Sequence, residues 1–330
     1  MTPAAADDKG SLGITHLKRF WSKALLRRSG LLGHDTFPEE WPQEMYLLST
    51  LKLGLEPTIQ FLFQQEPSFE AFEAWILAQN GGRLEEADIQ NFNEGVPPTS
   101  SEPDALCTKD LDQWEENGYV IVKQAVPKAD CEAAIEAICA NIEIDRNDPK
   151  TWYRGHDSRK GIMVQLFQHP ALNKNRNAPK IKRAFQQLWG RQDLLVNMDR
   201  AGFNPPEKED WRFPGPHLHW DVSLELPIPF GTQGILYLSD TAPEQGALQL
   251  IPGFQHRIQN WIESLPEKAN PRTQDLKALG PIRVGANAGD FIIWHQALPH
   301  GSSPNTTSLP RIVQYINYQP RVVEIQKEWK

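Results

Sequence analysis

Residues 289–318 read GDFIIWHQALPHGSSPNTTSLPRIVQYINY, and this stretch decides the predicted fold. Two runs rich in β-branched and aromatic residues, FIIWH and RIVQYINY, flank a turn made largely of Gly, Ser, Pro, Asn and Thr. This pattern is typical of two antiparallel strands joined by a loop. Similar short runs begin near residue 193: LLVNMDR, HLHWDVSLEL, GILYLSD and GALQLIPG. The region is therefore predicted to be a mainly β core, an antiparallel barrel or a double-sheet jelly roll.

The N-terminal part has the periodicity of α-helices instead. Its first segment spaces apolar residues along one helix face, namely Leu17, Phe20, Trp21, Ala24 and Leu25. A second helix is predicted over about 43–65, with an interruption near Pro57, and a third begins after the N-cap Ser68. Residues 1–92 are therefore predicted to form a small α-helical region, whose role the sequence leaves open.

A connector rich in Pro, Ser and Glu, NEGVPPTSSEPDA at 93–105, separates this region from the rest. Such a composition favours a solvated linker, so the main domain is predicted to span 106–330. Helices should flank its β core: one closed by Gly118, and two whose apolar residues share a face. These faces carry Cys131, Ala134, Ile135, Ile138 and Ile142 in one helix, and Ile181, Ala184, Phe185, Leu188 and Trp189 in the other.

Composition restricts the class of partner. The formal net charge of -8 and the pI near 5.6 disfavour a nucleic-acid binder, which would carry a basic face for phosphate. Three cysteines without CxxC spacing indicate neither a disulfide framework nor a structural zinc site. No apolar run approaches the length of a transmembrane helix, and the N-terminus lacks the layout of a secretory signal. We therefore expect a cytoplasmic protein that acts on a small molecule.

The segment HLHWD places His219 and Asp221 two residues apart. In a strand, side chains at i and i+2 project from the same face, so one strand can offer an imidazole and a carboxylate to one ion. His300, which follows a strand-like run and precedes a turn, is the natural third ligand. Two histidines and one carboxylate form the facial set that leaves positions open on Fe(II) for 2-oxoglutarate and O2. Polar side chains that merely hydrogen-bond to one another are the alternative.

Five sequence elements follow one another in a fixed order. They are His219-Trp220-Asp221, the segment GALQLIPGFQH from Gly246 to His256, the pair Gly289-Asp290, the triplet His300-Gly301-Ser302, and Arg311. In this order they resemble the phytanoyl-CoA dioxygenase family of Fe(II)/2-oxoglutarate oxygenases. The resemblance covers about residues 106–330, and it extends to no part of 1–105.

The resemblance implies a cupin-like double-stranded β-helix and assigns roles residue by residue. Iron would be held by His219, Asp221 and His300, which form the catalytic centre. Arg311 would bind the distal carboxylate of 2-oxoglutarate through two parallel charge-assisted hydrogen bonds, with help from the Ser302 hydroxyl. Because relatives that halogenate usually replace the carboxylate ligand, the intact Asp221 favours hydroxylation or another oxidation of a C–H bond, with release of succinate and CO2.

Other side chains near the motifs and in the first helix are also candidate functional residues. His217 would contact the co-substrate, or it would make an ordinary cross-strand contact. His256, Asp290 and His295 are interpreted as structural. Three tryptophans flank the motifs and would either line an apolar pocket or pack in the core: Trp211, Trp220 and Trp294. Basic residues of the first helix would receive phosphates, touch an anionic membrane or form a solvated face: Lys18, Arg19, Lys23, Arg27 and Arg28.

The leading hypothesis is therefore an Fe(II)- and 2-oxoglutarate-dependent dioxygenase. One alternative is a cupin-like binding protein without redox turnover, and another is a metal-dependent cupin enzyme that does not use 2-oxoglutarate. Neither alternative needs a dicarboxylate anchor, so Arg311 and Ser302 speak against both. The sequence leaves open whether the small-molecule substrate is apolar or carrier-linked, and whether the N-terminal helices build a homo-oligomer.

Overall fold

The computed structural model describes residues 2–33, 36–95, 103–215, 217–267, 269–322, 326 and 328–330. The α-helices are α1 (Leu17–Arg28), α2 (Trp41–Thr50), α3 (Leu55–Gln65), α4 (Phe69–Gln79), α5 (Glu86–Glu94), α6 (Thr108–Asn117), α7 (Lys128–Asn141), α8 (Pro170–Arg176), α9 (Pro179–Trp189) and α10 (Ile258–Ser264). The strands are β1 (Tyr119–Val122), β2 (Arg159–Lys160), β3 (Met163–Val164), β4 (Leu194–Val196), β5 (Ala201–Asn204), β6 (Thr232–Tyr237), β7 (Leu248–Leu250), β8 (Ile282–Val284), β9 (Phe291–His295), β10 (His300–Ser302), β11 (Arg311–Tyr315) and β12 (Tyr318–Pro320).

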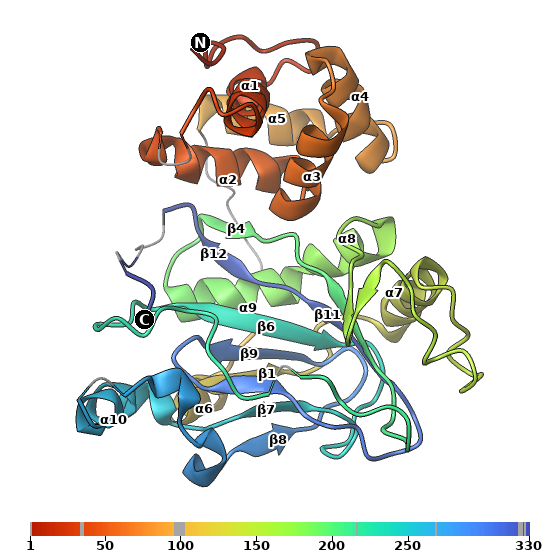
Figure 1. Cartoon of the computed structure of the whole chain (residues 1–330), viewed down its shortest axis with the longest axis vertical. Helices are drawn as coiled ribbons and strands as arrows, with labels where there is room; N and C mark the ends of the chain where they lie inside the picture. Colours follow the sequence, from red (N-terminus) through yellow and green to blue (C-terminus); the bar gives the residue numbers. More distant parts are fainter. Residues whose placement is uncertain are drawn as a thin grey trace.

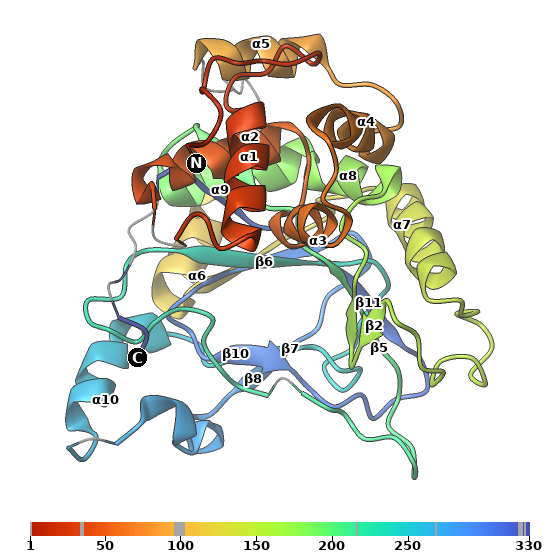
Figure 2. The same ribbon diagram turned by 45° about the horizontal axis from the view of Figure 1, so that its top comes forward.

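Two antiparallel sheets form the β core (Figure 1). Among the described residues, the larger sheet has the order β1-β9-β6-β11-β5-β3-β2 and the smaller one the order β10-β7-β8. The smaller sheet faces the larger one across the interior, as Figure 2 shows. His219 extends the smaller sheet through an isolated bridge to His300. The predicted double-stranded β-helix with flanking helices is thus confirmed. The two strands expected to be an antiparallel pair, β9 and β11, are not neighbours: β6 lies between them and pairs antiparallel with both, so they run in the same direction.

Side chains along the strands of the larger sheet point alternately to its two faces, and the central strands are buried almost throughout because each face packs against a different layer. Ile235 and Tyr237 of β6, with Val313 of β11, belong to the apolar cluster between the two sheets. Leu236 and Ile312 point the other way, into a cluster that includes residues of α7 and α9. The apolar faces predicted for α7 and α9 lie in or against that cluster, and the C-cap Gly118 ends α6 at a φ of 71°. The interior face of β6 and β11 is the one that carries the site.

Helices α1 to α5 pack around an apolar cluster of their own. Ser68 caps α4 as predicted, because its side chain accepts a hydrogen bond from the N–H of Ala71. The helix predicted over 43–65 is two helices, and the break lies at 51–54 rather than at Pro57. Pro57 falls in the first turn of α3, where a missing N–H costs no helical hydrogen bond. The chain turns at Lys52 instead, whose φ of 53° is left-handed.

This helical region lies on the β domain beside β4 and β12 (Figure 1). Leu195 of β4 is buried within the helical cluster. The Ser49 hydroxyl donates to the carbonyl of Val196 at 3.1 Å, and Arg200 pairs with Glu56 of α3 at 2.8 Å. Residues of α2 and α3 therefore contact both ends of the segment that follows β4.

The predicted linker 93–105 falls mainly on residues 96–102, which lie outside the described residues. Helix α5 ends at Glu94 and α6 begins at Thr108, so the proposed division into 1–92 and 106–330 stays a prediction. No helix in the described ranges has the length and apolar character needed to cross a membrane.

The basic residues of α1 do not form the free cationic or solvated face that the sequence suggested. Lys23 is fully buried and pairs with Glu40 at 2.9 Å and with Glu44 at 2.7 Å. Arg19 also binds Glu40, and its hydrogen bond, against the effect of burial, lowers the pKa of that carboxyl to about 2. Arg28 pairs with Glu66 at 2.6 Å. Carboxylates of the same helical region pair with Lys18, Arg19, Lys23 and Arg28, whereas Arg27 donates to the Thr36 carbonyl at 3.0 Å.

Candidate metal centre

His219 and His300 lie opposite each other on paired backbone segments. Their backbone N–H and carbonyl groups exchange hydrogen bonds of 2.9 and 3.0 Å. Each ring contacts a backbone carbonyl through Nδ1, with His219 at 2.7 Å from the oxygen of His217 and His300 at 3.0 Å from that of Leu298. A carbonyl only accepts, so Nδ1 carries a proton, and Nε2 is the ring nitrogen that faces Asp221 and can bind a metal ion. Both rings are therefore oriented to bind a metal through Nε2.

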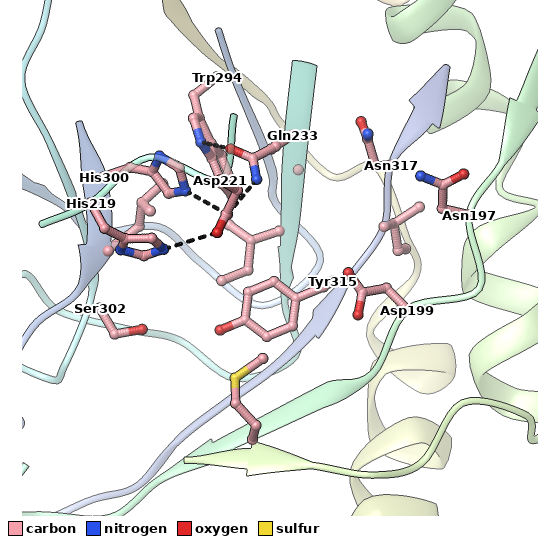
Figure 3. Close-up of a pocket in the computed structure, with 16 residues that line it drawn as sticks. Asn197, Asp199, His219, Asp221, Gln233, Trp294, His300, Ser302, Tyr315 and Asn317 are labelled. Carbon is pink, nitrogen blue, oxygen red and sulfur yellow. Dashed lines mark hydrogen bonds and ion pairs between the residues drawn. The ribbon is translucent and has the colours of Figure 1, made fainter. Parts of the chain in front are cut away.

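Asp221 lies between the two rings (Figure 3). Its Oδ1 is 3.3 Å from Nε2 of His219, and its Oδ2 is 3.2 Å from Nε2 of His300. Gln233 of β6 donates to Oδ2 at 2.7 Å and accepts from the indole N–H of Trp294 at 3.0 Å. The indole fixes which way the Gln233 amide points, and the amide in turn holds the carboxylate in place.

The three side chains fit one metal ion. One ligand atom from each lies within 4.8 Å of the others, in the described part of the chain. Two ligands about 2.1 Å from an ion and at right angles are about 3 Å apart, so small shifts suffice to close the site. A pair of histidines with one carboxylate is the set typical of non-haem Fe(II) oxygenases.

The pKa values of Asp221 and His219 are both shifted by their contact with each other. Burial by itself would raise the pKa of Asp221, but hydrogen bonds from His219 and His300 outweigh it and lower that pKa. Burial also lowers the pKa of His219, yet the hydrogen bond to Asp221 raises it overall. Both shifts show that the centre of the site favours positive charge.

The long strand predicted over 217–226 is wrong, because this segment pairs as a strand only at His219. Arg272 donates to the carbonyls of Trp220 and Val222 at 2.8 and 2.6 Å, and so takes the place of a neighbouring strand. Asp221 consequently reaches the site from a bend after the bridge. The His217 ring is exposed and lies against Phe213, with ring centroids 5.3 Å apart, so the structure does not bring it to the metal ligands.

Arg311 is fully buried, and all three of its guanidinium nitrogens are without a hydrogen-bond partner among the described residues. It begins β11 on the same face as Val313 and Tyr315, which is the face turned to the interior. The nearby Tyr237 hydroxyl is also buried, and burial raises its pKa to about 12. Tyr237 stays neutral and donates to the carbonyl of Val284 at 2.8 Å, so it offers no charge to Arg311.

A cavity of about 340 Å³ opens onto the three ligands. Ser302, predicted to assist Arg311, lines it and is buried. Sequence reasoning missed several lining residues: Asn197, Asp199, Gln233, Tyr315 and Asn317. Side chains two residues apart in a strand share a face, so Tyr315 and Asn317 are expected on the same side as Arg311. This spacing could have identified both residues from the sequence.

The tryptophans near the motifs, and Asp290 and His256, lie either at the cavity or in structural contacts. Trp294 lines the cavity, whereas Trp220 packs against Phe254 and Trp261, and Trp211 packs against Tyr153. Asp290 is buried, pairs with Lys123 at 2.9 Å and accepts from the N–H of Gln124. His256 contacts the carbonyl of Glu115 through Nε2 at 2.7 Å. Asp290 and His256 therefore have structural contacts, as their sequence context indicated.

His295 should make the protein less stable in mild acid. Burial lowers its pKa from 6.5 to about 4, and its Nδ1 accepts from the N–H of Ala297 at 3.0 Å. As the pH falls from about 6.5 to about 4, His295 binds a proton in the unfolded chain but not in the folded protein. The free energy of unfolding therefore falls over that pH window. The loss is on the order of 3 kcal/mol.

The measurement is the free energy of unfolding of the wild type and of His295→Gln across this pH window. Glutamine keeps an acceptor for Ala297 and removes the titration. The wild type should lose more stability than the variant, and parallel pH profiles would contradict the assignment.

Comparison with known proteins identifies the family to which the chain belongs. The family model of phytanoyl-CoA dioxygenase (PhyH) matches residues 114–313, well over half of the chain. The chain therefore belongs to the phytanoyl-CoA dioxygenase family. A putative phytanoyl-CoA dioxygenase of Dictyostelium discoideum is 24% identical over 285 residues, which cover 71% of this chain and 81% of the relative. A probable phytanoyl-CoA dioxygenase of Caenorhabditis elegans is 25% identical over 248 residues, covering 66% and 76%.

Solved structures with low sequence identity are also similar. EctD from S. alaskensis, solved with bound Fe, has a TM-score of 0.49 and 16% identity, over 68% of this chain and 80% of its own. The non-heme alpha ketoglutarate dependent carbocyclase SnoK from nogalamycin biosynthesis has a TM-score of 0.47 and 19% identity, over 67% and 87%.

Proposed function

We propose that this family member is an Fe(II)- and 2-oxoglutarate-dependent dioxygenase that hydroxylates, or otherwise oxidises at a C–H bond, a small organic substrate. The observation that carries the proposal is the combination of three converging ligands with one buried arginine that has no partner. His219, Asp221 and His300 would hold the iron. Arg311, with the Ser302 hydroxyl, would bind the distal carboxylate of 2-oxoglutarate.

The lack of a partner for Arg311 makes a dicarboxylate ligand the best explanation. A buried charge without a counter-ion is strongly destabilising, by several kcal/mol, unless something pairs with it. A carboxylate bound in bidentate fashion supplies both the opposite charge and the missing acceptors. A cupin-like binding protein, or a cupin enzyme that uses another co-substrate, has no need of such a residue.

The side chains around the ligands would control the chemistry. Bound Fe(II) and 2-oxoglutarate would supply an O2-driven oxidation of a substrate carbon, with succinate and CO2 as the other products. Gln233 holds Asp221 in its ligating position, and Trp294 holds Gln233. Ile235 and Leu248 line the cavity beside the ligands, where apolar side chains keep stray water away from the reacting carbon.

The β domain supplies all the residues of this proposed site. Those that line the cavity, within the part of the chain that the structure describes, fall between 163 and 317. We therefore propose that residues 106–330 are the oxygenase domain and that 1–92 is a separate helical unit joined to it by 93–105.

The test is an anaerobic titration of the metal-free protein with Fe(II) and then with 2-oxoglutarate. Chelation of iron by the keto acid should produce a visible metal-to-ligand charge-transfer band. Succinate, which has no keto group to chelate, is the matched control and should give no band. Binding of iron without this band would favour a cupin enzyme that does not use 2-oxoglutarate, and binding of neither would favour a cupin-like binding protein.

A further inference from the structure

The end of the cavity away from the histidines is polar. Figure 3 shows Asn197, Asp199 and Asn317 together on the far side of the pocket from His219 and His300. Asn197 and Asp199 follow β4, and Asn317 lies between β11 and β12. A backbone hydrogen bond of 2.8 Å, from the N–H of Asn197 to the carbonyl of Asn317, joins the two segments. The polar end is thus a joined pair of segments rather than a loose loop.

Several polar atoms at this end have no partner within the described ranges. Oδ1 of Asp199 accepts from the backbone N–H of Arg200 at 2.7 Å, whereas Oδ2 makes no hydrogen bond or ion pair. Asn317 accepts through Oδ1 from the Thr232 hydroxyl at 3.2 Å, which leaves its NH2 group free to donate. The Asn197 side chain makes no hydrogen bond with another described residue. A ligand at this end would therefore meet a carboxylate oxygen and two amides.

The charge of the cavity is negative at this end. Asp199 is the carboxylate of this end, the other lining carboxylate, Asp221, lies with the histidines, and the described lining residues include no lysine or arginine. Arg200 is next to Asp199, but its guanidinium is drawn away to Glu56 of α3 at 2.8 Å and lies over the Phe167 ring at 5.2 Å. Nε of Arg200 is 3.5 Å from Oδ1 of Asp199, so Oδ2 is left for a ligand.

The cavity lining also contains apolar side chains, among them Met163, Ile235 and Leu248. Figure 3 shows the ring of Tyr315 between Asp199 and the metal ligands. A substrate that lies along the cavity would have its polar group at Asp199 and a carbon near His219 and His300.

From these observations we propose that the substrate carries a cationic amine with a neighbouring hydroxyl group, and that Asp199, Asn197 and Asn317 bind this end. This inference rests on the proposed function and names the class of substrate for the same site. An ammonium group would donate to Oδ2 of Asp199 and to the side-chain oxygen Oδ1 of Asn197. A hydroxyl oxygen would accept from the side-chain NH2 group of Asn317. Asp199 balances the charge of the amine.

Two other substrate classes fit less well. An apolar acyl chain would cover the polar end without pairing it, at a cost of about 1–3 kcal/mol for each unsatisfied group. A carrier with phosphates would bring negative charge to Asp199, and the described lining offers no lysine or arginine to pair with it. A second cavity of about 420 Å³ shares Asp221, Gln233 and Asn317 with the first and gives room for a larger molecule. Its Arg191 is bound by Asp193 through two hydrogen bonds of 2.6 Å, so it is not free for phosphate.

The experiment measures succinate release by the full chain loaded with Fe(II) and 2-oxoglutarate, with added probe compounds. The probes are amino alcohols, polyols of the same length without the amine, a straight-chain fatty acid and its coenzyme A thioester. Amino alcohols should stimulate turnover most. Asp199→Asn should raise the KM for them at least about ten-fold, the equivalent of about 1.4 kcal/mol, with little change in kcat.

Two features of the chain keep this test interpretable. The backbone carbonyl of Asp199 accepts a hydrogen bond from Arg176 at 2.5 Å, and the substitution leaves that bond in place. Asp210→Asn is the matched control, because Asp210 pairs with Lys208 at 3.0 Å and lies outside both cavities. This control should keep the wild-type KM.

Each outcome separates the inference from the function on which it rests. Equal stimulation by amino alcohols and polyols, a preference for the fatty acid or its thioester, or a response to no amine would overturn the substrate class. An unchanged KM in Asp199→Asn would overturn the binding role of that carboxylate. If the wild type fails to form the charge-transfer band with Fe(II) and 2-oxoglutarate, the proposed function itself fails.

Discussion

Arg311→Leu is expected to weaken the binding of 2-oxoglutarate by roughly ten- to a hundred-fold or more, because a charge-assisted hydrogen bond contributes about 1.5 to 3 kcal/mol and a bidentate pair more. Metal affinity should barely change, since arginine is not a ligand. Both affinities can be measured by anaerobic titration of the wild type and the variant. Unchanged 2-oxoglutarate affinity would remove the anchor role, and lost metal binding would show that the residue is structural.

The fold supplies a matched control for this prediction in a second buried arginine. Arg176 is also fully buried, but it donates to the Asn173 side chain at 2.7 Å and to the Asp199 carbonyl at 2.5 Å. Arg176→Leu should lower the free energy of unfolding of the ligand-free protein. Arg311→Leu should leave that quantity unchanged or raise it, because it removes a buried charge that no described residue pairs. Equal destabilisation by both changes would mean that Arg311 already has a partner within the protein.

Asp221→Ala is expected to lower metal affinity by more than about 100-fold and to stop turnover. Loss of a residue that only supports a ligand typically costs 10- to 100-fold, and Asp221 is placed to be a ligand itself. It is also the sole anionic side chain of the three, so its removal takes away the charge that favours a cation. Metal binding can be followed by titration, and turnover by release of succinate.

Asp210→Ala provides the comparison for this change, since its carboxylate is exposed and pairs with Lys208. It should bind metal as the wild type does. Wild-type metal affinity or turnover in Asp221→Ala would remove Asp221 from the ligand set, whatever the behaviour of the two histidines.

Much of the fold follows from local patterns in the sequence. Residues that alternate between two apolar layers, such as Leu236 and Tyr237, produced runs that could be recognised as strands. The helix faces of α7 and α9 were recognisable for the same reason. The region 217–226 could not be assigned correctly, because its backbone carbonyls are bound by the side chain of Arg272, a residue far along the chain.

Some residues of the candidate site could be predicted from the sequence and others could not. His219, Asp221 and His300 could be proposed because their spacing and order are written in the sequence, and the structure brings them together. Gln233 and Asp199 could not, because their contribution depends on the register of β6 and on the path of the chain after β4. The lack of a partner for Arg311 is likewise a property of three-dimensional packing, since spacing alone does not reveal which acceptors surround a side chain.

The contact between the helical region and the segment after β4 bears on how this protein could diverge. Glu56 pairs with Arg200, and Ser49 hydrogen-bonds to Val196, on either side of Asn197 and Asp199, two of the three residues that form the polar end of the cavity. Substitutions in α2 or α3 would therefore change the shape of the proposed substrate-binding end without altering the proposed metal ligands. On this proposal, changes in the helical region could alter which substrate is bound while the reaction stays the same.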